Sequence, residues 1–200
     1  MDGERISFEA CLRQAFALYK DHFLLLLLTH ITLVGVSVFS LGILAGPMMV
    51  GVVRIVLGLL DDRSPSPQPG DIFDGLRFFL PSLLLGLAVG VASAVAARVL
   101  GLLLIGPLAL LLGPILPLAA TVFAFFMIAE RGMDFWSALQ AGWTRVKPVF
   151  WPVAGLVAIG WAVSLLGLLA FYCGVVLTLP FYTCLTAVLW RRMEGTTTPP

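Results

Sequence analysis

The chain is 200 residues long; 60% of its residues are hydrophobic and only 12% are charged. Soluble domains carry about 25% charged residues, and a fold of this size still exposes much of its surface. The composition therefore excludes an ordinary water-soluble domain and predicts an integral membrane protein. The net charge of +1 supplies no basic surface for a nucleic acid, so no nucleic-acid partner is expected.

Long apolar tracts dominate the sequence, over residues 24–60, 78–129 and 148–190. A membrane-spanning helix needs about 20 apolar residues, so each tract predicts two spans joined by a turn. Glycines mark the expected turns, at Gly42, between Gly101 and Gly113, and at Gly174. The prediction is an all-α membrane protein with six transmembrane helices, at about residues 23–40, 42–60, 81–100, 109–129, 149–171 and 174–191.

The charged residues predict the orientation. All acidic residues, and all basic residues except Arg54 and Arg98, lie in the N-terminal stretch, the loops at 61–77 and 130–147, and the C-terminal tail. Six helices in hairpin order place these four segments on one side of the membrane. The positive-inside rule makes that side cytoplasmic, together with both termini. The mixed charges before Phe23 are unlike a signal peptide, so we expect the first span to be retained.

A threefold internal repeat is the most informative pattern. Three segments begin with a small polar residue, an apolar residue next to it and a leucine four residues later: Ser7-Phe8-Leu12, Asp71-Ile72-Leu76 and Asp134-Phe135-Leu139. A small residue precedes each leucine: Cys11, Gly75 and Ala138. Serine and aspartate suit an N-cap, and the apolar spacing of four predicts an amphipathic helix lying in the membrane interface.

Each repeat unit is thus expected to consist of an interfacial amphipathic helix followed by a helical hairpin. The units cover about residues 7–63, 71–131 and 134–194, within a single domain over 1–195, and the tail at 196–200 is expected to be disordered. Aromatic residues at the interfacial helices are the predicted anchors: Phe8, Phe16, Phe135 and Trp143.

A proline in the second span of each unit is the other shared mark. These prolines are Pro47, Pro117 and Pro180. Each lies a few residues after a glycine, at Gly42, Gly113 and Gly174, and before a charged end, at Asp61, Glu130 and Arg191 respectively. Proline inside a span removes a backbone hydrogen bond and kinks the helix. We therefore predict kinks at these three prolines.

Three sequence segments carry a family resemblance: SFEACLRQAFALYKDHF near the N-terminus, DFWSALQAGWTRVK from Asp134, and LTLPFYTCLTAVLW from Leu177. They resemble bacterial multi-pass inner-membrane proteins of the YciC type and the membrane domain associated with glycerophosphodiester phosphodiesterases. The resemblance covers nearly the whole chain and implies a multi-pass protein of the bacterial inner membrane. It implies no shared activity, and the chain has no phosphodiesterase domain.

No catalytic, cofactor or metal motif is present in the sequence, so we expect neither an enzyme nor a cofactor. His22 and His30 have no acidic or thiol partner at ligand spacing and are expected to be interface or helix-packing residues rather than metal ligands. Arg54 and Arg98 interrupt the spans, and an arginine in a membrane is a candidate functional residue. Each is expected either to extend toward the headgroup region or to contact a lipid phosphate.

Three functions are compared on these grounds. The favoured one is a non-catalytic membrane protein that organises lipid or a protein partner at the cytoplasmic face, with another membrane protein or a second copy as alternatives to lipid. The second is a transporter or channel for a small or amphiphilic solute, which would need a polar cavity near the three prolines. The third is an intramembrane lipid enzyme, and the spans hold no convergent titratable groups for one.

Overall fold

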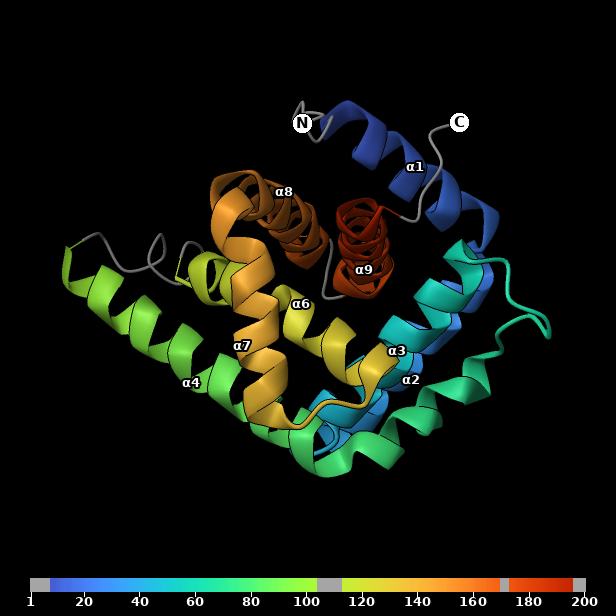
Figure 1. The fold of residues 1–200 in the computed structure, drawn as a ribbon, viewed down its shortest axis with the longest axis horizontal. Coiled ribbons are helices and arrows are strands. Elements are labelled where there is room, and N and C mark those ends of the chain that lie inside the picture. Colours follow the sequence, from blue (N-terminus) through green and yellow to red (C-terminus); the bar gives the residue numbers. More distant parts are fainter. Residues whose placement is uncertain (1–7, 104–112, 170–172, 196–200) are drawn as a thin grey trace.

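The computed structural model describes residues 8–103, 113–169 and 173–195, and within these ranges helices are joined by turns and loops, with no strand (Figure 1). The elements are α1 (Phe8–Asp21), α2 (Phe23–Phe39), α3 (Ala45–Leu60), the 3₁₀ helix η1 (Pro69–Phe78), α4 (Phe79–Leu103), α6 (Ile115–Arg131), α7 (Phe135–Val146), the short 3₁₀ helix η2 (Lys147–Val149), α8 (Phe150–Leu169) and α9 (Cys173–Glu194).

Within the described residues, each predicted span overlaps one helix, namely α2, α3, α4, α6, α8 or α9; residues 109–112 and 170–171 of the predicted spans lie outside the described residues. The predicted turn at Gly42 is confirmed, since Leu41 and Gly42 have left-handed backbone angles, with φ of 51° and 86°. Gly174 lies inside the first turn of α9 rather than in a turn between helices. Most of the predicted turn between Gly101 and Gly113, and the tail at 196–200, lie outside the described residues.

Within the described residues, one continuous helical stretch is long and apolar enough to cross a membrane, Pro69–Leu102. Only 11% of its most apolar part is buried, unlike the core helix of a soluble protein. A second candidate arises if the pair Glu9–Asp21 and Phe23–Phe39, bent by 87°, is counted as one span. Ala45–Leu60 is apolar but shorter.

The helices pack in the same way in each predicted repeat unit. We call α2, α4 and α8 the outgoing helices, α3, α6 and α9 the return helices, and α1, η1 and α7 the amphipathic segments. Each outgoing helix packs against the return helix of its own unit and against that of the preceding unit. Each amphipathic segment packs against the preceding unit's return helix: η1 on α3, α7 on α6 and α1 on α9.

The packing is therefore a closed ring. The second unit packs on the first and the third on the second, and the first unit in turn packs on the third. Figure 1 shows the outcome, with α9 near the middle, α1 beside it, and α4 along one edge of the molecule. The N-terminal amphipathic segment thus contacts the C-terminal helix, although they lie at opposite ends of the sequence.

Small residues let the amphipathic segments approach the return helices closely. Cys11 and Ala138, two of the small residues noted before each leucine, are fully buried. At the third, Gly75, an added Cβ would overlap the Pro47 carbonyl oxygen. Gly142 of α7 has the same role, because a Cβ there would lie 2.9 Å from the Ala124 nitrogen. At Gly75 and Gly142 the backbones of the paired elements are in contact, and no side chain larger than hydrogen fits between them.

The capping predictions have mixed outcomes. Asp134 is the N-cap of α7, and its carboxylate accepts hydrogen bonds from the backbone N–H groups of Trp136 and Ser137, both at 3.1 Å. Asp71 is not an N-cap, because η1 begins earlier, at Pro69, with Gln68 as its N-cap. Asp71 is the third residue of η1 and accepts a hydrogen bond from the Gln68 backbone N–H at 2.8 Å. Ser7 lies outside the described residues.

The prolines differ from the predicted kinks. Pro47 and Pro117 are each the third residue of α3 and α6. Backbone N–H groups in a first turn have no intrahelical partner, so proline there breaks no hydrogen bond. These two prolines belong to helix starts, which corrects the prediction that they kink the spans. Only Pro180 lies inside a helix, α9, where Thr183 donates to its carbonyl at 2.9 Å.

Buried apolar side chains fill the space between the return helices. Trp190 of α9 is completely buried and stacks on Phe126 of α6, with ring centroids 5.4 Å apart. Phe123 is also fully buried, with its ring centroid 5.3 Å from that of Trp190. From α3, Met48, Val52 and others complete this core.

The contact between η1 and α3 is tested by Gly75→Ala. An added methyl would clash with the α3 backbone, so we expect the free energy of unfolding to fall by about 1–3 kcal/mol, the range for overpacked cores. Thermal unfolding of the purified protein in detergent measures this. Gly70→Ala in the same 3₁₀ helix is the control, because a Cβ at Gly70 meets nothing within 4 Å. Equal stability of the two variants would contradict the close packing.

Candidate functional site at the charged end of the bundle

The return helices end together in a cluster of charged side chains, which we call the charged end; it comprises Asp61, Glu130, Arg191 and Glu194. Arg191 of α9 is its centre. Its guanidinium donates two hydrogen bonds to Asp61, the C-cap of α3, at 2.8 and 2.6 Å. It also donates to Glu130 of α6, and to Glu194 at 3.2 Å. One side chain therefore joins all three return helices.

A second layer of contacts ties α7 to this cluster. Glu194 accepts hydrogen bonds from Arg131 at 3.0 Å and from Arg145 of α7 at 2.7 Å. The Arg145 guanidinium lies 4.8 Å from the centre of the Trp190 ring. The Trp190 indole N–H donates to Glu130 at 2.8 Å, so Trp190 connects the apolar core to the ion cluster.

The charged end is sufficiently buried that its ion pairs affect the stability of the fold. Only 8% of the Arg191 side chain is exposed, against 30% for Asp61 and 14% for Glu194. Removing one partner from a buried ion pair leaves an uncompensated charge, which is strongly destabilising. In the sequence analysis, Asp61, Glu130 and Arg191 marked only the ends of the predicted spans. Two of them are acidic and one is basic, and this difference in charge was the signal that could have predicted an ion pair between them.

Arg54 lies beside this cluster in a role that the sequence did not indicate. It donates a hydrogen bond at 3.0 Å to the carbonyl of Ala129, in the last turn of α6, and its guanidinium lies 5.8 Å from the centre of the Phe78 ring. The last four carbonyls of a helix have no intrahelical partner. Arg54 therefore caps the C-terminal end of α6 from α3. Contact with a lipid phosphate stays a prediction for this residue.

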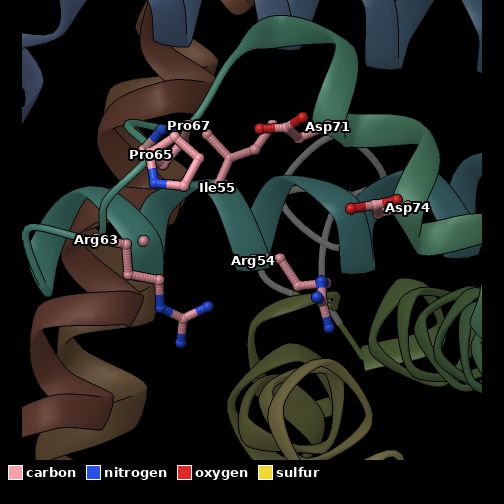
Figure 2. A pocket seen from close by; sticks show the side chains of 8 residues that line it. Arg54, Ile55, Arg63, Pro65, Pro67, Asp71 and Asp74 are labelled. Atoms are coloured by element: carbon pink, nitrogen blue, oxygen red, sulfur yellow. The ribbon is translucent and has the colours of Figure 1, made fainter.

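Arg54 also lines two small cavities together with Arg63. One, of about 120 Å³, lies between α3, the proline-rich loop and η1 (Figure 2). Figure 2 shows both guanidinium groups pointing to the same side of α3, away from Asp71 and Asp74. The other cavity, of about 260 Å³, reaches Ala129 and Glu130 of α6. Charged residues that line these cavities have ion-pair partners elsewhere in the protein: Arg63 pairs with Asp61 at 3.6 Å, Asp74 with Arg77 at 3.4 Å, and Glu130 with Arg191.

A larger groove lies between the second and third units, where α4 contacts α7. Its volume is about 620 Å³, within the usual range for small-ligand sites. Its walls are mainly apolar, and Arg77 of η1 and Asp134 of α7 are the charged groups that line it. The lining residues are Arg77, Phe78, Leu80, Pro81, Leu84, Gly132, Met133, Asp134, Phe135 and Trp136.

The apolar wall of this groove continues into an exposed stripe along α4. Leu80 and Leu84 belong both to the groove and to this stripe, with side chains 63% and 40% exposed. The stripe follows helical spacing to the far end of α4: Leu80, Leu84, Leu87, Val91, Val95, Val99 and Leu102. The groove thus joins a charged rim to a long apolar surface.

The remaining predicted site residues do not gather at one place. Arg98 is exposed near the far end of α4, and its contact with lipid stays a prediction. Phe16 and Trp143 are 58% and 43% exposed on α1 and α7, while Phe135 is half-buried in the groove. The side chain of Phe8 lies outside the described part of the structure.

The described residues contain no group of three or more histidine, cysteine, aspartate or glutamate side chains arranged to hold a metal ion. His30 is fully buried, with Nδ1 2.8 Å from the Leu26 carbonyl oxygen and Nε2 3.3 Å from the Thr183 hydroxyl. It links α2 to α9, which is the packing role expected from the sequence. No family model, curated protein or solved structure matches this chain.

The central role of Arg191 is tested by Arg191→Met. The substitution leaves Asp61 and Glu130 without their buried partner, so we expect a loss of about 3–5 kcal/mol in stability. Adding Asp61→Asn and Glu130→Gln to this variant should restore part of that loss, because the unpaired charges are then gone. Thermal unfolding in detergent measures both, with Arg13→Gln at an exposed pair as control. A loss of the same size in the triple variant would contradict the electrostatic explanation.

Proposed function

We propose that this chain is a non-catalytic, multi-pass membrane protein that holds membrane lipid at the cytoplasmic face. Its exterior supports a membrane setting. Leu24 and Phe39 of α2, and the whole α4 stripe, are exposed large apolar side chains. A monomeric soluble protein rarely exposes a continuous apolar patch of this extent.

The proposal includes six spans arranged as three tandem units. The helices α2, α3 and α6 have 16 or 17 residues, which at about 1.5 Å per residue corresponds to roughly 25 Å. Spans slightly shorter than the hydrocarbon core are accommodated by local thinning of the bilayer. The shared packing pattern of the three units, closed by α1 on α9, supports the tandem arrangement.

The charged end is assigned to the cytoplasmic side. Arg63, Arg131, Arg145, Arg191 and Arg192 lie at or near the ends of the return helices, and basic residues accumulate on the cytoplasmic side of membrane proteins. The amphipathic segments begin near this end and run back along the return helices, since Gln14 of α1 contacts Arg192 of α9 and Gly75 of η1 lies against Pro47 at the start of α3. Localisation in a bacterial inner membrane rests on the sequence resemblance.

The groove between α4 and α7 carries the functional proposal. A membrane lipid has a charged headgroup and apolar chains, and the groove offers a charged rim at Arg77 and Asp134 with apolar walls beneath. Those walls lead into the α4 stripe, along which an acyl chain can lie. This arrangement suits a bound amphiphile better than a soluble polar ligand.

The alternative of a channel or transporter has less support. A path along the axis of the return helices would need a polar cavity near the prolines. Between α6 and α9 the space is occupied instead by the buried rings of Phe123, Phe126 and Trp190, which contact one another. The ion cluster around Arg191 lies across the end of the same helices.

Lipid retention tests the proposed function. Leu84→Trp places a large ring in the groove, whereas Leu24→Trp makes the same change on the exposed apolar surface of α2, away from the groove and the α4 stripe. Native mass spectrometry after purification in mild detergent should show phospholipid on the natural protein and on Leu24→Trp, and several-fold less on Leu84→Trp. A natural protein that keeps no phospholipid, or equal retention by both variants, would refute the proposal.

A further inference from the structure

We infer that the groove selects a zwitterionic phospholipid with a primary ammonium group, binding its phosphate at Arg77 and its ammonium at Asp134. This inference rests on the proposed function and specifies the lipid that the groove holds. It follows from the two opposite charges that line the groove from different elements.

The phosphate-binding role falls to Arg77. It lies in the last turn of η1, with its side chain 74% exposed, and it pairs with Asp74 at 3.4 Å one turn earlier. Exposed ion pairs of this kind contribute little, so the guanidinium can turn toward a ligand at small cost. Arginine binds phosphate through two parallel N–H donors.

The ammonium-binding role falls to Asp134, which the fold holds in place. As the N-cap of α7 it accepts hydrogen bonds from the N–H groups of Ser137 and Trp136. Hydrogen bonds from Ser137, and then from Trp136, hold the pKa of this carboxyl below its ordinary value, so it is anionic at neutral pH. A carboxylate has about four acceptor positions, which leaves capacity for a ligand N–H.

The two charges together discriminate between headgroups. An anionic lipid such as phosphatidylglycerol satisfies Arg77 but brings negative charge next to Asp134 and Asp74, and like charges repel. A choline headgroup has no N–H to donate to Asp134. An ethanolamine headgroup supplies both a phosphate and three N–H donors, so it matches both charges. The apolar walls and the α4 stripe accept the acyl chains of any of these lipids.

Competition among three lipids tests this selectivity. Purified protein is delipidated in detergent and offered equal amounts of phosphatidylethanolamine, phosphatidylglycerol and phosphatidylcholine with identical acyl chains, and bound lipid is counted by native mass spectrometry. We expect about tenfold preference for phosphatidylethanolamine, the size expected for a hydrogen bond between charged groups. Asp134→Asn should abolish the preference while keeping α7 capped, because asparagine is an equally good N-cap.

Arg77→Gln should reduce retention of all three lipids, since each carries a phosphate. Arg13→Gln, at an exposed ion pair on α1, is the matched control and should leave the preference unchanged. Thermal unfolding confirms that Asp134→Asn stays folded. If lipid binds without headgroup preference, or if Asp134→Asn keeps the preference, this inference is wrong while the proposed function stands. If the natural protein binds no lipid at all, the proposed function itself fails.

Discussion

The hydrogen bonds of the Arg191 guanidinium are the constraint on which the remaining structure depends. They join the ends of α3, α6 and α9, which come from three separate parts of the chain. A buried guanidinium is tolerated only when its positive charge is paired with carboxylates. The helix ends that supply Arg191 and its carboxylate partners therefore have to meet. Glu194 and Trp190 then connect the same point to α7 and to the apolar core.

A closed ring of packing surrounds this centre. Each amphipathic segment lies on the return helix of the preceding unit, and glycine or another small residue forms the contact. A single unit would leave its return helix uncovered and its amphipathic segment without a support. All three return helices carry an amphipathic segment only because α1 rests on α9. Stability is therefore shared around the ring and does not belong to any one hairpin.

The ring also explains where a ligand is expected to bind. The groove between α4 and α7 is formed where the second unit meets the third, with Arg77 from one and Asp134 from the other. Arg77 lies in the last turn of η1 and Asp134 is the N-cap of α7, so the charged rim lies beside the amphipathic segments. The apolar wall follows α4 away from that rim. A lipid bound there would contact two units at once and extend along the outside of the bundle.

The sequence by itself determined the helical class, the approximate positions of the apolar helices within the described residues, the turn at Gly42 and the cap at Asp134, because these depend on residues close together in the chain. It misplaced the start of η1, and it assigned kinks to Pro47 and Pro117, since helix boundaries depend on tertiary packing. Only the tertiary structure decided that Arg54 caps α6 and that Arg77 and Asp134 share a groove. Arg191 and Asp61 are 130 residues apart, and no local periodicity records a pairing over that distance. Composition and spacing specify what each helix can bury, whereas the meeting of helix ends is determined by the packing of the whole chain.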